Sequence, residues 1–545
     1  MKTEYSSKTK KQSKSSFPCF SIRNHFPALC IFFLVACFAL PAIGATPRVQ
    51  VKVAEYPRDA SFTMPAGGTW SLAGKHGRIG PRDVCVVHGV LRTPAVKKFH
   101  VMVESVALRE PGKLDEALAK WRATGRPIHT FPLGKISYEA DGKTVSWDGR
   151  VAMIGVGVFP LREAAQTLTD DLAKVGSSSW ILEEVVSRAR GVIDLKINRR
   201  SVARGEAVLA LTPAETTLMK QVEVAKGYSW HGFKDRVYRG PLTFAWGAQD
   251  ALDVVLATDL ETVLAGVVPS EISSKAAIGA LQAQAVAARG EILGKIGMRH
   301  IGEGFDFCSE QHCQVFSGES AESNTMARAI NPTRGYLLQD SDGGIVDAVY
   351  GANCGGHTEA SHLVWTSPPN AVLSGVWDSQ RPPASDLSTE EGVTGFIRIP
   401  PKCWCDDASV EGGDKFRWKK SITGVEWNKV VEAGQVGRIR DVKDFARGFS
   451  GRLCRLTLVG ETGTRSIMKE LPIRKLFGGL RSACFIVSWK RDAAGFITGG
   501  DFVGAGWGHG VGMCQTGAQA MAKGGAPFPR ILAHYFPGSR LVKAY

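Results

Sequence analysis

Alternating apolar and polar residues, the pattern of half-buried strands, characterise the first half of the chain. The alternation is clearest at residues 49–53 and at 84–87. Residues 136–138 and 144–147 flank the dipeptide Asp141-Gly142, an arrangement typical of a β-hairpin. We therefore predict a β-rich region from residue 46 to about residue 237, in which we find no chemical motif and no clear repeat.

Helical spacing of apolar residues predicts three helices. Residues 161–172 and 182–189 are predicted to be short helices inside the β-rich region. A longer helix should follow Ser273 and Ser274, which can cap its free amide groups, and should end near Gly297. The apolar stripe of this helix recurs every three or four positions, at Ile278, Leu281, Ala285, Ala288 and Ile292.

Shorter elements surround the long helix. Residues 254–256 predict a strand, residues 260–267 a helical turn or a strand, and residues 530–536 a last helix. Helices and strands mix here without βαβ regularity, which indicates an α+β fold. We expect a mixed second domain at 238–545, preceded by the smaller β-rich region at 46–237, whose role the sequence leaves open.

The N-terminal segment has the order of a secretory signal peptide. Basic residues precede an apolar run at 28–40, and the small residues Ala42, Gly44 and Ala45 follow it. The run is shorter than the roughly 20 residues that span a bilayer, although a retained anchor or lipidation at Cys37 remains an alternative. We predict that residues 1–45 are cleaved and that the protein is exported to the periplasm or cell envelope.

The chain is basic, with 67 Lys and Arg against 52 Asp and Glu, a formal charge of +15. Removal of residues 1–45 takes away six basic residues and Glu4, which leaves about +10. Export makes nucleic acid an unsuitable partner for this charge, and an anionic envelope polymer fits better. A merely solvated basic surface is the alternative.

Glycine occupies every second position from 504 to 512, near the end of the chain. Each glycine costs conformational entropy unless its missing Cβ is needed, so we expect this backbone to lie close against another part of the molecule. Trp507, His509 and Gln515 would then be held at fixed points. A flexible linker is disfavoured, because linkers are polar and this segment contains Trp507, Val511 and Met513.

Glu271 precedes the predicted long helix. At the positive end of that helix a carboxylate would be stabilised and its pKa lowered. A general acid requires the opposite, a pKa raised by desolvation. Glu271 could act in this way only if apolar neighbours or bound substrate excluded water.

Five motifs, in the same order over about 300 residues, resemble the SpoIID/LytB family of sporulation proteins and amidase enhancers. They lie at 264–289, 312–316, 352–359, 447–452 and 504–518. The resemblance implies a peptidoglycan-binding lytic transglycosylase that cuts MurNAc–GlcNAc bonds in peptide-stripped glycan strands, with Glu271 as catalytic acid/base. It equally admits a non-catalytic enhancer of a peptidoglycan amidase.

One carboxylate suffices for this chemistry, because the 6-hydroxyl of muramic acid attacks in place of water and leaves a 1,6-anhydro end. A second carboxylate does not stand out in sequence near Glu271. The family resemblance does not extend to residues 46–237, or does so only weakly.

Cysteine and histidine residues form a second candidate site. Nine cysteines follow residue 45, an odd number. Thiolate and imidazole ligands at short spacing suit tetrahedral zinc, and the resemblance implies such a site; the candidate ligands are His300, Cys308, His312 and Cys313. A Cys308–Cys313 disulfide, or pairing of either with Cys354, is the alternative. A zinc hydrolase ranks last, because the chain has no HExxH helix.

Substrate-binding candidates lie along the same motifs. Arg289 could hold a lactyl carboxylate bidentately, or be a solvated helix charge. Tyr350 could hydrogen-bond a sugar, and His357 could approach the cleft or be an ordinary turn residue. Trp507 and His509 could contact sugar or serve packing alone, and Gln515 completes the predicted set. Cys403 and Cys405 are too close in sequence for a relaxed disulfide.

Overall fold

The computed structural model describes residues 46–134, 136–138, 145–227, 230–319, 323–365, 367 and 369–545. The predicted signal peptide, including its alternatives as anchor or lipidation signal, lies outside the described residues. About a quarter of the chain is helical and 39% is strand, so the α+β class is confirmed. Among the described residues, none of the helices has the length and apolarity needed to cross a membrane.

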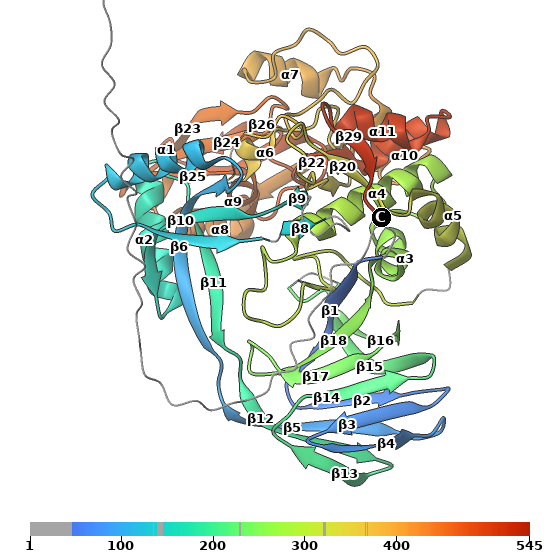
Figure 1. The fold of residues 1–545 in the computed structure, drawn as a ribbon. Coiled ribbons are helices and arrows are strands. Elements are labelled where there is room, and N and C mark those ends of the chain that lie inside the picture. Colours follow the sequence, from blue (N-terminus) through green and yellow to red (C-terminus); the bar gives the residue numbers. More distant parts are fainter. Residues whose placement is uncertain are drawn as a thin grey trace, which may run out of the picture. The chain divides into compact units, whose positions relative to one another are not determined.

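Two large sheets pack through a shared core (Figure 1). The first has the order β19 (Phe307–Cys308), β1 (Arg48–Tyr56), β18 (Leu252–Asp259), β17 (Leu242–Trp246), β14 (Leu209–Pro213), β3 (Gly68–Leu72) and β4 (Lys75–Ile79). The second has the order β13 (Arg200–Gly205), β12 (Arg190–Ile197), β5 (Cys85–Thr93), β2 (Asp59–Thr63), β15 (Thr216–Val224) and β16 (Gly232–Arg239). The strands predicted at 49–53, 84–87 and 254–256 are therefore confirmed.

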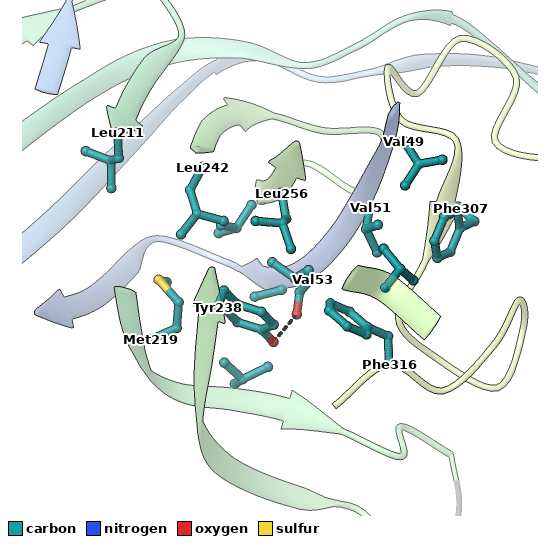
Figure 2. Close-up of a cluster of buried hydrophobic side chains, with 14 of the residues drawn as sticks. Val49, Val51, Val53, Leu211, Met219, Tyr238, Leu242, Leu256, Phe307 and Phe316 are labelled. Carbon is teal, nitrogen blue, oxygen red and sulfur yellow. Dashed lines mark hydrogen bonds between the residues drawn. The ribbon is translucent and has the colours of Figure 1, made fainter. Parts of the chain in front are cut away.

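The core of these sheets unites both predicted regions (Figure 2). Val51, from β1, and Leu256, from β18, are both fully buried in it. The buried Tyr238 hydroxyl donates a hydrogen bond to the Val53 carbonyl at 3.2 Å. β1 pairs with β18 on one side and with β19 on the other. Strands from both sides of residue 238 thus share one sheet.

A third sheet, with two helices, completes the N-terminal part. Its order is β11 (Trp180–Ser187), β6 (Val96–Ala107), β10 (Val151–Phe159) and β7 (His129–Leu133), and it carries α1 (Pro111–Arg122) and α2 (Arg162–Lys174). The predicted helix at 161–172 is confirmed. The predicted hairpin is also present, as β8 (Ile136–Tyr138) paired with β9 (Val145–Asp148), and its turn at Asp141-Gly142 lies outside the described residues.

The helix predicted at 182–189 is wrong, because residues 182–187 lie in β11 and no helix forms at 188–189. Val185 of β11 is buried, and the strand pairs antiparallel with β6 along most of its length. β-branched residues fit such a half-buried pleated surface. Strand pairing therefore overrides the weak local helical pattern.

The C-terminal part is built around α4 (Ile278–Lys295), which packs against α3 (Leu260–Glu271), α5 (Ser323–Thr333), α10 (Gln515–Lys523) and α11 (Phe528–Tyr535). The capping role predicted for Ser273 and Ser274 is wrong, because α4 starts after Ala277 and has no side-chain cap. α3 resolves the ambiguity at 260–267 in favour of a helix, and α11 corresponds to the predicted last helix. A two-stranded ladder joins β20 (Tyr336–Gln339) to β29 (Arg540–Lys543).

Residues 360–505 form an excursion that leaves this core and returns to the same place. The short strand before it, β21 (Tyr350–Gly351), pairs parallel with the short strand after it, β28 (Met513–Cys514). Within the excursion lie α6 (Ser361–Val364), α7 (Glu390–Arg398), β22 (Arg417–Thr423), α8 (Gly424–Gly434), β23 (Ile439–Arg447), β24 (Leu453–Gly460), β25 (Gly463–Met468), α9 (Glu470–Leu476), β26 (Phe485–Arg491) and β27 (Ile497–Ala505).

Candidate functional site

Glu271 is the last residue of α3, not a residue at the start of the long helix. Its half-buried carboxylate accepts a hydrogen bond from the Val315 amide at 3.0 Å. Burial raises the pKa of Glu271 to about 7, the charge of Glu291 adds to the rise, and the Val315 bond opposes it. The predicted lowering by a helix N-terminus is therefore wrong, and the group has the raised pKa that a general acid needs.

Polar groups with unused hydrogen-bonding capacity lie near this carboxylate. Burial, with the charges of Glu271 and Glu291, raises the pKa of Tyr350, so its hydroxyl stays protonated. That hydroxyl and the amide nitrogen of Gln284 are buried without a geometrically satisfactory partner among the described residues. Sequence reasoning missed Gln284 and Glu291. Their spacing of seven residues on α4, which repeats one helical face, is the signal that could have found them.

Gln515 joins the glycine segment to the end of α3. Its side-chain amide donates to the Glu271 carbonyl at 2.8 Å and to the Gln284 side chain at 3.3 Å. Gln515 is the first residue of α10 and directly follows β28. The C-terminal segment thus fixes the backbone of Glu271, more than two hundred residues upstream.

The glycine segment lies tightly against its neighbours, as its composition predicts. Gly510 has a φ of +75°, and a Cβ there would lie 2.3 Å from the guanidinium carbon of Arg452. Arg452 is buried and donates to the carbonyls of Cys354 and His357. The missing Cβ of Gly510 therefore lets Arg452, a residue of the excursion, bind the backbone that precedes the excursion.

The motifs at 352–359 and 447–452 bind each other. The buried Glu359 accepts hydrogen bonds from the amides of Phe449 and Ser450 and from the Ser450 hydroxyl. These hydrogen bonds, with those of Arg452, connect the residues that precede the excursion to residues within it. His357 is buried in the same layer; its Nδ1 donates to the Thr358 carbonyl, and burial lowers the pKa of His357 to about 4. Its environment is that of a neutral packing residue.

Arg289 is fully buried and already bonded. Its guanidinium forms a bidentate ion pair with Glu261, at 2.9 and 2.8 Å, and donates to the Tyr336 carbonyl at 3.0 Å. Tyr545 also donates to Glu261. Arg289 is therefore neither the solvated charge nor the substrate-facing residue that the sequence suggested, and it joins α3, α4 and the C-terminus.

Trp507 and His509 differ in access. Trp507 is 38% exposed, and the cations of Lys415 and Arg481 lie 5.3 and 4.6 Å from its ring centre. His509 accepts from the Val511 amide through Nδ1 and donates through Nε2 to the Tyr350 carbonyl. Burial lowers the pKa of His509 to about 4, so it stays neutral. Sequence reasoning missed Lys415 and Arg481, which no local motif marks.

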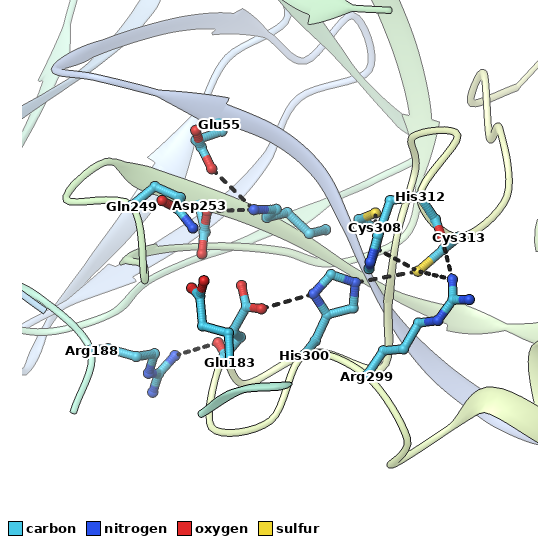
Figure 3. Close-up of polar contacts among 12 residues, drawn as sticks. Glu55, Glu183, Arg188, Gln249, Asp253, Arg299, His300, Cys308, His312 and Cys313 are labelled. Atoms are coloured by element: carbon cyan, nitrogen blue, oxygen red, sulfur yellow. Dashed lines mark hydrogen bonds and ion pairs between the residues drawn. The ribbon is translucent and has the colours of Figure 1, made fainter. Parts of the chain in front are cut away.

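The four predicted metal ligands converge (Figure 3). Their ligand atoms all lie within 4.8 Å of one another, with His300 Nε2 at 3.3 Å from the Cys313 sulfur and His312 Nδ1 at 3.6 Å from it. His300 Nδ1 bonds Glu303 at 2.9 Å, the carboxylate contact that orients many zinc-binding histidines. The two thiols and two imidazoles fit tetrahedral zinc. Cys308 and Cys313 are not joined by a disulfide.

A cavity of about 900 Å³ adjoins this cluster. It is lined by His300, Cys308 and His312 together with residues of β1 and β11, and Glu271 is not among its lining residues. The candidate active site is therefore the group of residues around Glu271, which lies outside the lining of this cavity.

Comparison with known proteins agrees with the motif pattern. Residues 248–339 match the family model described as stage II sporulation protein, SpoIID. The chain contains a SpoIID-family domain. Residues 359–512, which include the whole excursion, match a second model, described as a domain of unknown function (DUF8618).

Curated relatives carry names from the same family. The chain is 28% identical over 295 residues to the amidase enhancer of Bacillus subtilis (strain 168), a match that covers 51% of this chain and 40% of that relative. It is 26% identical over 309 residues to stage II sporulation protein D of the same strain, covering 52% of this chain and 75% of the relative. The match thus spans less than half of the amidase enhancer.

Proposed function

We propose that this SpoIID-family chain is an exported lytic transglycosylase of peptidoglycan. It cleaves MurNAc–GlcNAc bonds, preferentially in peptide-stripped glycan strands, and leaves 1,6-anhydro-MurNAc ends. The observation that carries the proposal is the half-buried carboxyl of Glu271, whose pKa of about 7 provides both protonation states near neutral pH. The names of the relatives are consistent with a location in the cell envelope.

A single carboxyl group balances the reaction. Protonated Glu271 donates its proton to the glycosidic oxygen as the C1–O4 bond breaks. The resulting carboxylate takes the proton of the muramic acid 6-hydroxyl as O6 bonds to C1, so Glu271 ends protonated. No water is consumed, and intramolecular attack avoids much of the entropy of capturing a second molecule.

The groups around Glu271 would position it for both steps. The Val315 amide stabilises the carboxylate formed in the first step. The Gln515 amide holds the Glu271 carbonyl, which limits movement at the end of α3. Trp507, exposed and close to two cations, is the best placed of the predicted contacts to stack on a sugar and to set a lactyl carboxylate near Arg481 or Lys415.

The cluster of His300, Cys308, His312 and Cys313 would hold a structural zinc, because four protein ligands leave no coordination position for a reactive water. Cys313 lies two residues before Val315, whose amide binds Glu271. The site would therefore stabilise the loop that supports the catalytic carboxylate.

The test is the Glu271→Gln variant on peptide-free glycan strands. Mass spectrometry of the products should show 1,6-anhydro ends with the wild-type protein and none with the variant. Glu163→Gln, an exposed change on α2, is the matched control and should cleave normally. Full cleavage by Glu271→Gln would refute the catalytic assignment.

A non-catalytic amidase enhancer is the second candidate, because a relative carries that name. In that case the wild-type protein should produce no anhydro ends and should accelerate a purified peptidoglycan amidase. Glu271→Gln should leave this stimulation intact, since the carboxyl plays no chemical part in it.

A further inference from the structure

A second group of metal-ligating side chains lies at the base of the excursion, apart from the cluster around His300. It consists of Cys354, Asp378, Cys405 and Cys514, whose ligand atoms all lie within 4.8 Å of one another. Every member is buried, with at most 4% of its surface exposed. We propose that these four residues bind one zinc ion tetrahedrally.

The sulfur spacing favours a shared metal ion over a disulfide. The Cys354 and Cys405 sulfurs are 3.7 Å apart. Two thiolates bound to one tetrahedral zinc, each at about 2.3 Å, lie about 3.8 Å apart. A disulfide requires about 2.05 Å. Any single disulfide among Cys354, Cys405 and Cys514 would leave one of the three thiols without a partner.

The surroundings suit thiolates. The Cys514 sulfur accepts from the Cys354 amide at 3.2 Å and from the Gly517 amide at 3.4 Å. It lies at the N-terminus of α10, where the helix dipole stabilises negative charge. The Gly356 amide points to the Cys354 sulfur at 3.5 Å. Such N–H donors stabilise a metal-bound thiolate without competing for the metal.

The carboxyl group of Asp378 is held in place by two hydrogen bonds. Asp378 accepts from the Cys405 amide at 2.8 Å and from the Tyr535 hydroxyl at 2.5 Å. Among the residues that the structure describes, it forms no ion pair with Lys, Arg or His. In their ionised, metal-binding forms, three thiolates and a carboxylate buried together need a cation. The Asp378 carboxylate also packs closely against α10, because a Cβ on Gly517 would lie 2.4 Å from it.

The four ligands come from four separate stretches. Cys354 precedes the excursion, Asp378 and Cys405 lie within it, and Cys514 follows it. A metal ion here would hold the two ends of the excursion together. Its ligand Cys514 directly precedes Gln515, which binds the Glu271 carbonyl. This role is structural and does not depend on whether the protein cleaves glycan.

Metal analysis of the full chain, supplied with Zn²⁺ and purified without chelator, tests the inference. We compare wild type, a Cys405→Ser/Cys514→Ser variant, a His300→Ala/Cys313→Ser variant, and Cys403→Ser as a control at a buried cysteine outside the cluster. We expect two zinc ions per chain in wild type and control, and one in each double variant. If the His300 cluster binds no zinc, the wild type and the His300→Ala/Cys313→Ser variant should each hold one zinc ion.

Absence of zinc from the His300→Ala/Cys313→Ser variant, when wild type and control hold one ion, would overturn the inference. Two measurements on the unmutated protein guard against misfolding of a variant. Anomalous diffraction at the zinc edge should give a peak among Cys354, Cys405 and Cys514. Thiol alkylation under non-reducing conditions should find no disulfide among them, and a mapped Cys354–Cys405 disulfide or metal-free thiols would overturn the inference.

Discussion

Replacing Glu271 with glutamine should change how the stability of the protein depends on pH. The folded protein holds this carboxyl at a pKa of about 7, against an ordinary value of 4.5, chiefly through burial. The folded state therefore binds the proton more tightly than the unfolded chain does. The associated stability is fully present below about pH 4.5 and is lost as the pH rises through 7. A glutamine has no such proton, so the variant should escape this loss.

The size of the effect follows from the two pKa values. Each tenfold difference in proton affinity is worth about 1.36 kcal/mol. A pKa of about 7 in the folded state against 4.5 in the unfolded chain therefore corresponds to a loss of about 3 kcal/mol of folding stability above pH 7. The residue is half-buried, and solvent screening makes this an upper limit. At about 2.1 cal/mol/K per residue, unfolding of roughly 500 residues as one unit gives a Tm difference of about 3 °C.

Thermal unfolding of wild type and Glu271→Gln at pH 4.5, 6, 7 and 8 measures this difference. Other groups titrate in both proteins, so the Tm of the variant minus that of the wild type isolates Glu271. We expect this difference to increase toward pH 8, and Glu163→Gln, at an exposed position of α2, to show no such increase. A constant difference across the pH range would refute the argument, and with it the poised carboxyl on which the proposed chemistry depends.

Three further substitutions test the architecture. Arg289→Ala should destabilise the protein by about 3–5 kcal/mol in urea unfolding, because it leaves the buried Glu261 without its partner; an unchanged midpoint would contradict this. Gly510→Ala should lower the Tm more than Gly508→Ala, since both have positive φ but only the first meets a neighbouring side chain; equal losses would contradict the close approach. Gln515→Leu should lower the rate of glycan cleavage at least tenfold while the fold persists by circular dichroism, and an unchanged rate would remove its positioning role.

Local sequence determined the elements whose pattern is strong and regular. Alternation predicted β1, and helical spacing predicted α4, because these patterns match the faces that the strand and helix bury. The close backbone approach predicted for the glycine segment is confirmed, since few other physical causes favour so many glycines beside large apolar residues. The His300 cluster was also predictable, because three of its four ligands lie within six residues.

Tertiary structure alone decided the features that depend on distant segments. Residues 180–187 became β11 because β6 pairs with them. Arg289 became an internal ion pair because Glu261 lies on the neighbouring α3.

The sequence by itself identified Glu271 and its motif, but its chemical character came from the fold. Its raised pKa results from burial by segments far along the chain. The Cys354 cluster gathers ligands spread over 160 residues, so no local spacing could reveal it. Residue type and period are local properties, whereas burial, pKa and metal geometry are set by which distant segments meet.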